Sequence, residues 1–231
     1  MIDWHSHILP AMDDGSRDVS ESLEMLRALN EQEINYVVAT PHFYANKESL
    51  DSFLERRKSS YDTLSKSVDG SFPEVFLGAE IAYYPGISKM SGLELLKIEN
   101  TDLLLLEMPI SKWTEYTLKE LLELAATRGL TLVIAHVDRC ISLQSREVLK
   151  RLCYNGILMQ VNASFFRNVI GRRKALKLLR DGMLHFIGSD CHNMTSRPPR
   201  IADTYDLIKR KFGGEFLSQM NQYGLSMLKI N

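Results

Sequence analysis

Short apolar runs alternate along the chain with longer stretches whose apolar residues recur every three or four positions. Short runs with few polar residues are typical of strands buried on both faces of a parallel sheet, and the longer stretches have the period of amphipathic helices. The pattern therefore predicts alternating strands and helices. The predicted strands cover residues 2–5, 36–40, 75–79, 103–106, 131–135, 158–161 and 185–188, and the predicted helices cover residues 20–33, 48–67, 115–128, 145–155, 174–180 and 201–211.

The number and spacing of these elements favour one α/β barrel over two smaller domains. Seven strand–helix units fall within 231 residues, and no proline- or glycine-rich linker separates them. We therefore expect a single domain that spans residues 1–231. Residues 65–73 are the expected surface loop, and the tail after Phe212 is expected to add a helix or two.

Side chains that can bind metals follow six of the seven predicted strands. The carboxyl ends of the strands in a parallel barrel converge on one face, where the active sites of such barrels lie. His5 and His7 lie on the same side of a strand because they are two residues apart, and Asp190 and His192 repeat this spacing. Gly15 allows a tight turn that brings a neighbouring carboxylate to the cluster. The expected ligands are His5, His7, Asp14, His42, Glu80, Glu107, His136, Asp190 and His192.

Nine ligands are too many for one ion and suffice for two or three, with a carboxylate such as Glu80 as a bridge. Imidazoles and carboxylates without thiolates suit Mn²⁺, Fe²⁺ or Zn²⁺. Each residue alone has a simpler explanation: Asp14 could cap the following helix, and Glu107 could pair with a lysine. Five of the six histidines nevertheless occupy these positions, and only His185, within an apolar run, is left over.

Composition and charge exclude several classes of protein. The chain carries 28 Lys and Arg against 29 Asp and Glu, a net charge of −1, whereas proteins that bind nucleic acid normally have a basic excess. Cys140, Cys153 and Cys191 form no CxxC pair, which is typical of reduced thiols in the cytosol. The chain opens without a signal peptide, and no apolar run approaches the length of a membrane span. We expect a cytoplasmic protein that binds no nucleic acid and does not insert into a membrane.

The motifs around the expected ligands resemble a known superfamily. The sequence His-Ser-His-Ile-Leu-Pro at residues 5–10, with Asp-Asp-Gly at residues 13–15, resembles the opening of PHP-superfamily phosphoesterases. Within that superfamily, Ala-His-x-x-Arg, Ser-Asp-x-His-Asn and Arg-Pro-Pro are similar to motifs of the bacterial capsular-polysaccharide tyrosine phosphatases. The motifs of the resemblance, which covers roughly residues 1–210, lie at residues 5–10, 13–15, 40–42, 78–81, 106–107, 134–139, 160–162, 189–193 and 197–199.

The resemblance implies a distorted (β/α)₇ barrel of the PHP type with a trinuclear centre that is usually manganese-dependent. Some relatives carry a second histidine where this chain has Phe43, a difference that concerns the rim of the pocket. The implied division of the ligands is His5, His7, Glu80 and Asp190 for the first ion, Glu80, Glu107 and His136 for the second, and Asp14, His42 and His192 for the third.

The implied activity is metal-dependent hydrolysis of phosphotyrosine on a protein. The implied partner is an autophosphorylating bacterial tyrosine kinase of capsule or exopolysaccharide synthesis. Paired ions activate water at neutral pH, so no side-chain base is needed. Arg139 and Arg197 follow predicted strands, and we expect them to be catalytic residues that bind the phosphate; the alternative is surface ion pairing. Arg200 is a weaker third candidate.

Competing functions remain at this point. The first alternative is a small-molecule phosphatase that resembles histidinol-phosphate phosphatase, and the others are an exonuclease and an inactive metal-bound module that docks on another protein. The spacing from Cys191 to Arg197 also matches the C-x₅-R pattern of cysteine-dependent tyrosine phosphatases. That loop needs glycines around a thiolate, and none lies between the two residues.

Two further segments have both a functional and a structural interpretation. The basic stretch at residues 165–174 is either a phosphopeptide or nucleic-acid surface or, as we favour, a solvated helix face. Tyr83, Tyr84 and Pro85 either form an aromatic wall beside the pocket or pack within their own loop.

Overall fold

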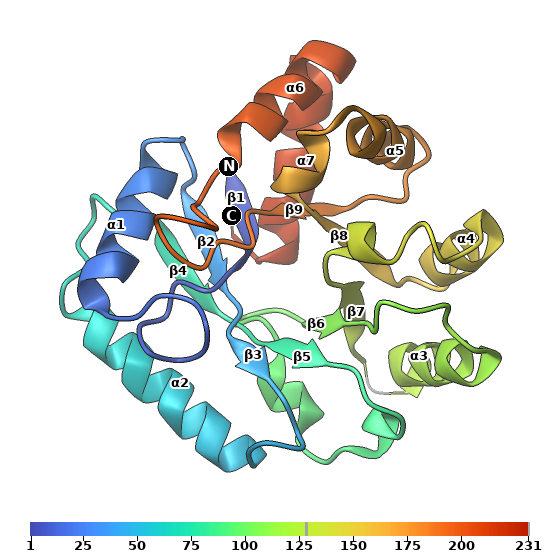
Figure 1. Ribbon diagram of the computed structural model, residues 1–231, viewed down its shortest axis with the longest axis horizontal. Coiled ribbons are helices and arrows are strands. Elements are labelled where there is room, and N and C mark those ends of the chain that lie inside the picture. The colour runs from blue at the N-terminus through green and yellow to red at the C-terminus, as the bar shows by residue number, and fades with distance from the viewer. Residues whose placement is uncertain (128, 231) are drawn as a thin grey trace.

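A ring of parallel strands surrounded by helices forms the protein, as Figure 1 shows. The computed structural model describes residues 1–127 and 129–230. The strands within these residues are β1 (Ile2–Ser6), β2 (Tyr36–Ala39), β3 (His42–Phe43), β4 (Glu74–Leu77), β5 (Glu80–Ala82), β6 (Leu103–Glu107), β7 (Thr131–Ile134), β8 (Leu158–Asn162) and β9 (Phe186–Gly188). The α-helices are α1 (Val19–Asn30), α2 (Leu50–Ser65), α3 (Glu115–Thr127), α4 (Arg146–Tyr154), α5 (Val169–Arg180), α6 (Ala202–Phe212) and α7 (Gly214–Met227). Four short 3₁₀ helices are η1 (Ile87–Lys89), η2 (Leu93–Leu96), η3 (Val137–Arg139) and η4 (Ala163–Phe166).

The nine strands form seven staves, the continuous strand positions around the barrel. Two staves are interrupted, so that β2 and β3 share one stave and β4 and β5 share another. Parallel pairing gives the orders β1-β2-β4 and β3-β5-β6-β7-β8-β9. Pro41 has no N–H to continue the ladder, and it lies in the two-residue break between β2 and β3. Hydrogen bonds from Gly78 N to Ala39 O (2.8 Å) and from Glu80 N to Pro41 O (3.0 Å) carry the pairing across both breaks. The predicted seven-stranded barrel is confirmed, with two of its strands kinked.

The kinks change where two of the expected ligands lie on their staves. The apolar pattern predicted strands that end before His42 and Glu80. In the structure His42 is the first residue of β3 and Glu80 the first of β5, so each stave continues beyond its ligand. Short polar–apolar segments such as β5, of only three residues, are too brief to have a recognisable period.

The barrel closes where β9 meets β1. Asp190 N donates to His5 O (2.8 Å) and His7 N donates to Cys191 O (2.9 Å), around a bridge between Ser6 and Cys191. Gly188 makes this approach feasible, because a Cβ there would lie only 2.4 Å from the Cβ of His5. The first and last staves therefore bring the two ends of the chain's sequence into one site.

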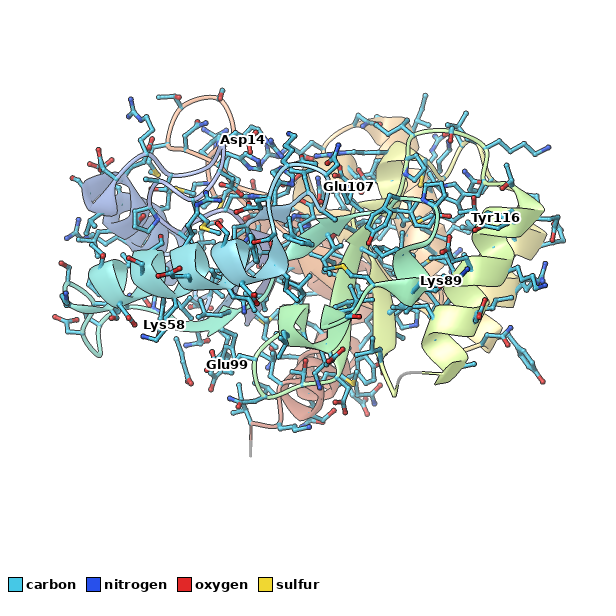
Figure 2. All side chains as sticks on the ribbon, turned by 90° about the horizontal axis from the view of Figure 1, so that it is seen from below. Asp14, Lys58, Lys89, Glu99, Glu107 and Tyr116 are labelled. Atoms are coloured by element: carbon cyan, nitrogen blue, oxygen red, sulfur yellow. The ribbon has the colours of Figure 1, made fainter. Side chains whose placement is uncertain are left out.

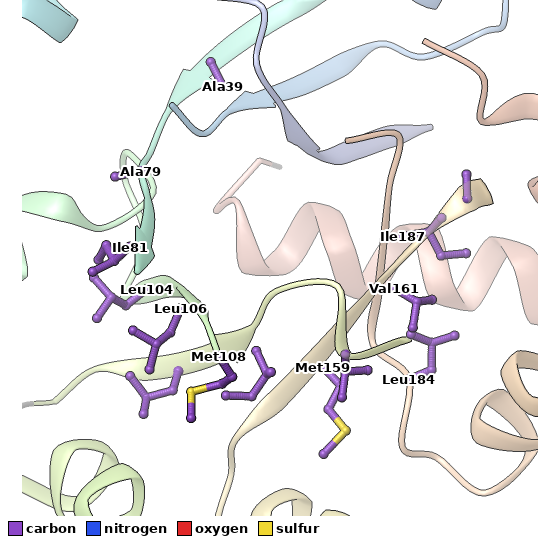
Figure 3. Packing of buried hydrophobic residues seen from close by; sticks show 14 of the residues in the cluster. Ala39, Ala79, Ile81, Leu104, Leu106, Met108, Met159, Val161, Leu184 and Ile187 are labelled. Carbon is purple, nitrogen blue, oxygen red and sulfur yellow. The ribbon is translucent and has the colours of Figure 1, made fainter. Parts of the chain in front are cut away.

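Both faces of the staves are buried, which explains their continuous apolar runs. On β6, Leu104 and Leu106 pack in the core between sheet and helices, as the close view in Figure 3 shows. Leu103 and Leu105 point to the other side, into a second cluster that contains Trp4 and Leu228. The alternation follows from the two-residue period of a strand.

The helices largely match their predicted positions. The helix α7 confirms the expected addition after Phe212, and the expected loop at residues 65–73 separates α2 from β4. The helix α5 begins at Val169, five residues before the predicted start, and the predicted end of another helix at Arg128 lies outside the described residues. Within those residues, no helix has both the length and the apolar character of a membrane span.

Candidate metal centre

All nine expected ligands lie at the carboxyl-end mouth of the barrel. They come from β1, β3, β5 and β6 and from the segments that follow β1, β7 and β9. Figure 2 shows Asp14 and Glu107, which are far apart in the sequence, at the same edge of the molecule. His5, His7, Glu80, His136, Asp190 and His192 are buried, His42 and Glu107 are partly buried, and Asp14 is exposed. The structure thus brings together every residue that we selected as a ligand.

Around His5 and His7, nitrogen and oxygen atoms face one another. Their Nε2 atoms lie 3.2 Å apart, which agrees with their placement on one side of the strand. Glu80 Oε2 lies 3.2 Å from His5 Nε2 and 3.3 Å from His7 Nε2. Asp190 Oδ1 lies 3.7 Å and 3.5 Å from the same two atoms. These four side chains are the set implied for the first ion.

The carboxylate of Glu80 extends the cluster on its other side. Glu80 Oε1 lies 2.6 Å from His136 Nε2, which in turn lies 3.3 Å from Glu107 Oε1. His42 Nδ1 approaches Glu80 Oε2 to 3.0 Å. The two oxygens of Glu80 therefore face different histidines, as a bridging ligand requires.

A third group surrounds the exposed carboxylate of Asp14. Asp14 Oδ1 lies 3.4 Å from His42 Nε2 and 3.5 Å from His192 Nε2. The alternative role of Asp14 as a helix cap does not apply, because Asp18 caps α1 by accepting a hydrogen bond from Glu21 N. The ligand atoms of His7, Asp14, His42 and His192 all lie within 4.8 Å of one another. His7 and His42 thus border two groups each, so the implied division among three ions is less sharp in the geometry.

Two buried imidazole nitrogens face carboxylates without forming a hydrogen bond, which indicates that the cluster fits metal ions. His42 Nδ1 lies 3.0 Å from Glu80 Oε2 and His192 Nε2 lies 3.5 Å from Asp14 Oδ1, but within the described residues neither nitrogen has a well-oriented hydrogen-bond partner. A buried polar atom without a partner is costly, and an imidazole lone pair directed into a group of carboxylates is suited to a cation. His136 and Asp190 also have left-handed backbones, with φ of 26° and 54°. Such conformations are uncommon outside glycine and cluster at functional sites.

The pKa values reflect the density of carboxylates. Burial by itself lowers the pKa of His7, but the hydrogen-bonded carboxylates of Asp13 and Glu80 outweigh it and raise this pKa to about 10. Burial also lowers the pKa of His136, but the carboxylates of Glu107 and Glu80 outweigh burial and raise this pKa to about 9. Burial raises the pKa of Glu80, yet the surrounding histidines hold it well below its usual value. Carboxylates that favour cationic imidazoles in this way also favour divalent cations.

Two supporting residues were given no role by the sequence reasoning. Asp13 Oδ2 accepts hydrogen bonds from His7 Nδ1 (2.7 Å) and His42 N (2.8 Å), and so directs His7 Nε2 into the cluster. Gln160 Oε1 accepts from His136 N and lies 3.3 Å from His5 Nδ1. The available signal for Gln160 was a polar residue within an apolar strand, and Asp13 was visible only as part of the Asp-Asp-Gly motif.

Arg139 and Arg197 lie side by side at the rim and share one carboxylate oxygen. Their Nη2 atoms lie 2.6 Å and 2.7 Å from Asp190 Oδ2, and Asn162 Nδ2 donates to the same oxygen (2.7 Å). Because Asp190 Oδ1 faces His5 and the other histidines, Asp190 joins the arginines to the ligand cluster. The partner of both arginines is thus a buried residue of the site. A cavity lies beside these two arginines, and within the described residues Arg200 does not line it.

Cys191 and Tyr83, the candidate nucleophile and a candidate for the aromatic wall of the pocket, have structural roles. Cys191 is buried in the main hydrophobic core, and burial raises the pKa of its thiol, so its side chain is neither exposed nor ionised as a nucleophile requires. The Tyr83 hydroxyl donates to Glu120 Oε2 (2.7 Å), which supports packing within the loop for this residue.

Fold and site together define a parallel α/β barrel with a cluster of nitrogen and oxygen donors at its mouth that could hold metal ions. The sequence profile of the capsular polysaccharide synthesis CpsB/CapC family matches residues 1–224. The chain belongs to this family.

Known relatives match almost the whole chain. The tyrosine-protein phosphatase YwqE of Bacillus subtilis is 30% identical over 93% of this chain and 86% of its own length. The tyrosine-protein phosphatase CpsB of Streptococcus agalactiae serotype III is 27% identical over 95% of this chain and 94% of its own. A solved structure comes from a crystallographic study of B. subtilis YwqE and Streptococcus pneumoniae CpsB, which describes them as unique metal-dependent tyrosine phosphatases. It superposes on this chain with a TM-score of 0.82 at 28% sequence identity. The match covers 99% of this chain and 94% of the other. These likenesses agree with the resemblance that the motifs indicated.

Proposed function

We propose that the chain is a metal-dependent protein-tyrosine phosphatase. Its substrate is a phosphotyrosyl protein, an autophosphorylating bacterial tyrosine kinase that controls capsule or exopolysaccharide synthesis. It acts in the cytoplasm, and residues 1–231 function as one phosphatase domain. The observation that carries the proposal is the convergence of nine histidine and carboxylate side chains, one of which, Asp190, is shared by two arginines. The names of the relatives support the choice of phosphotyrosine.

The ligand cluster would hold two or three ions, with Mn²⁺ as the expected metal and Fe²⁺ or Zn²⁺ as ions that accept the same donors. His5, His7, Glu80 and Asp190 would bind the first, Glu80, Glu107 and His136 the second, and Asp14, His42 and His192 the third. Bound ions of this kind activate water at neutral pH and neutralise charge on phosphoryl oxygens. The buried nitrogens of His42 and His192, which face carboxylates without forming a hydrogen bond, support this assignment.

The chain's own residues orient the substrate. The side chains of Arg139 and Arg197 are partly exposed, at 33% and 38%, and both guanidinium groups contact Asp190 at the ligand cluster. Two planar forks with spare N–H donors can bind phosphoryl oxygens while Asp190 holds them in place. Asp190 and Asn162 thus position the arginines, and the arginines align the phosphate with the centre.

Parallel turnover of two substrates tests the proposed activity. The full chain, treated with chelator and reloaded with Mn²⁺, should hydrolyse a phosphotyrosyl peptide with a kcat/KM far above that for histidinol phosphate. The reverse preference would establish the small-molecule alternative and overturn the proposal. Absence of turnover by the metal-loaded chain on both substrates would favour a docking module.

Metal content tests the ligands separately from activity. His192→Ala should lower the number of bound Mn²⁺ ions, measured by elemental analysis after equilibrium dialysis. His185→Asn is the matched control, because His185 is the one histidine outside the cluster and accepts a hydrogen bond from Met159 N. Equal metal content in both variants would contradict the third ligand group.

The arginine roles are tested by paired substitutions. Arg139→Gln and Arg197→Gln should each lower kcat on the peptide by roughly 10²–10³-fold, the usual effect of removing a donor to developing charge. Surface ion pairing, the alternative interpretation, predicts no change in kcat.

A further inference from the structure

A cavity of about 230 Å³ adjoins the metal centre. Its inner wall is formed by Asp190 with Arg139 and Arg197, and its outer wall includes Ser164 and Arg167. Ser164 and Arg167 lie in and directly after η4, which follows Asn162 without a break, and Asn162 donates to Asp190. The outer wall is therefore held in a defined position relative to the ligand cluster.

The charges on this cavity are unequal. Three arginines line it, against the carboxylates of Asp138 and Asp190. Asp190 already pairs with Arg139 and Arg197, while Asp138 is half-buried and accepts a hydrogen bond from the backbone N–H of Asn162 (3.0 Å). The positive charge of the cavity is therefore not balanced on its outer side.

Arg167 is the cation that supplies the imbalance. Its guanidinium donates one long hydrogen bond, from Nη2 to the carbonyl of Arg200 (3.4 Å), and no carboxylate of the described residues pairs with it. Its side chain is exposed, and the hydroxyls of Ser164 and Ser196 lie on the same cavity. A guanidinium with free donors beside a polar cavity is suited to a carboxylate or phosphate.

We propose that Arg167 and Ser164 form a second anion subsite, which binds an acidic or phosphorylated residue next to the phosphotyrosine that reacts. This inference rests on the proposed function. The reacting phosphate is held by the ligand cluster, Arg139 and Arg197, so Arg167 is left for a neighbouring side chain on the outer side. The basic stretch at residues 165–174 thus contains one substrate contact, whereas Arg173 and Lys174 lie exposed on α5 and Phe166 is buried in the core.

Peptide preference measures the subsite. Three phosphotyrosyl peptides would be compared at low ionic strength, with alanine, aspartate or a second phosphotyrosine beside the reacting residue. We expect the two anionic peptides to exceed the alanine peptide in kcat/KM by roughly three- to tenfold, the range for a partly exposed ion pair with charge-assisted hydrogen bonds. The preference should shrink as salt is added, because screening weakens exposed pairs.

Charge reversal at Arg167 should invert the preference. Arg167→Gln should bring the ratio of anionic to alanine peptide close to one, and Arg167→Glu should bring it below one. Arg173→Glu is the matched control: Arg173 is exposed on α5 and does not line the cavity within the described residues, so the ratio should stay as in the wild type. A stronger effect for aspartate or for the second phosphotyrosine identifies the preferred anion.

The outcomes separate the two levels of the proposal. Equal kcat/KM for all three peptides, or a preference that survives in Arg167→Glu, overturns the subsite and leaves the phosphatase assignment intact. Turnover of histidinol phosphate without turnover of any phosphotyrosyl peptide overturns both.

Discussion

Closure of the barrel at Gly188 offers a direct test of how the first and last strands assemble the site. In Gly188→Ala the new Cβ would lie 2.4 Å from His5 Cβ and 2.9 Å from both His5 N and Gln160 Nε2. Carbon atoms in contact normally lie about 3.5–4.0 Å apart, so β1 and β9 must separate by about 1 Å. His5 cannot move aside alone, because it is fully buried and its carbonyl accepts the hydrogen bond from Asp190 N.

Two effects set the expected magnitude for Gly188→Ala. Overpacking of this kind lowers the free energy of unfolding by about 1–3 kcal/mol. Replacing glycine also reduces the entropy of the unfolded chain, which raises the free energy of unfolding by about 0.4–1 kcal/mol. The free energy of unfolding should therefore fall by about 1–2 kcal/mol. Activity should fall further, by about 100-fold, because a displacement of about 1 Å at His5 disturbs the ligand cluster.

Urea denaturation and peptide hydrolysis with Mn²⁺ would measure the two quantities. Gly70→Ala is the matched control, since a Cβ at Gly70 has no atom within 4 Å and the same chemical change is made. If Gly188→Ala matched Gly70→Ala in both stability and turnover, the reasoning that the close approach of β1 and β9 builds the site would be refuted.

Three further predictions concern single side chains. Burial lowers the pKa of His185 to about 4, against about 6.5 in an unfolded chain. The unfolded chain therefore gains a proton first as the pH falls from 7 to 4, and His185 makes the wild type lose up to about 3 kcal/mol of stability over that range. The difference in unfolding free energy between wild type and His185→Asn should shrink by a similar amount, and a constant difference would contradict the assignment. Asp13→Asn should weaken Mn²⁺ binding about 10–100-fold, because the carboxylate that orients His7 loses its charge; unchanged affinity in a metal titration would show that His7 is held by other contacts. Cys191→Ser should keep metal-dependent turnover, whereas loss of turnover with metal content intact would favour a cysteine nucleophile.

The sequence carried much of the site in its local patterns. The His-x-His and Asp-x-His spacings at residues 5–7 and 190–192 place two side chains on one side of a strand wherever that strand lies. Apolar runs of four or five residues between amphipathic stretches predict strands covered on both faces, and seven such units without a linker favour one parallel barrel. Parallel strands then require their carboxyl ends to meet, so the ligand list follows from order along the chain alone.

Long-range contacts decided the rest, because no local pattern contains them. The kinks that place His42 and Glu80 at the start of β3 and β5 depend on hydrogen bonds between neighbouring staves. The choice of Asp18 to cap α1, which leaves Asp14 for the cluster, depends on the path of the loop. Arg139 and Arg197 meet at one oxygen of Asp190 because the segments that follow β7 and β9 lie together at the mouth of the barrel. The sequence by itself determined which chemical groups reach the mouth of the barrel, since strand order and period are local properties. Their pairing and orientation were decided by tertiary packing, since those depend on contacts between different strands and loops of the barrel.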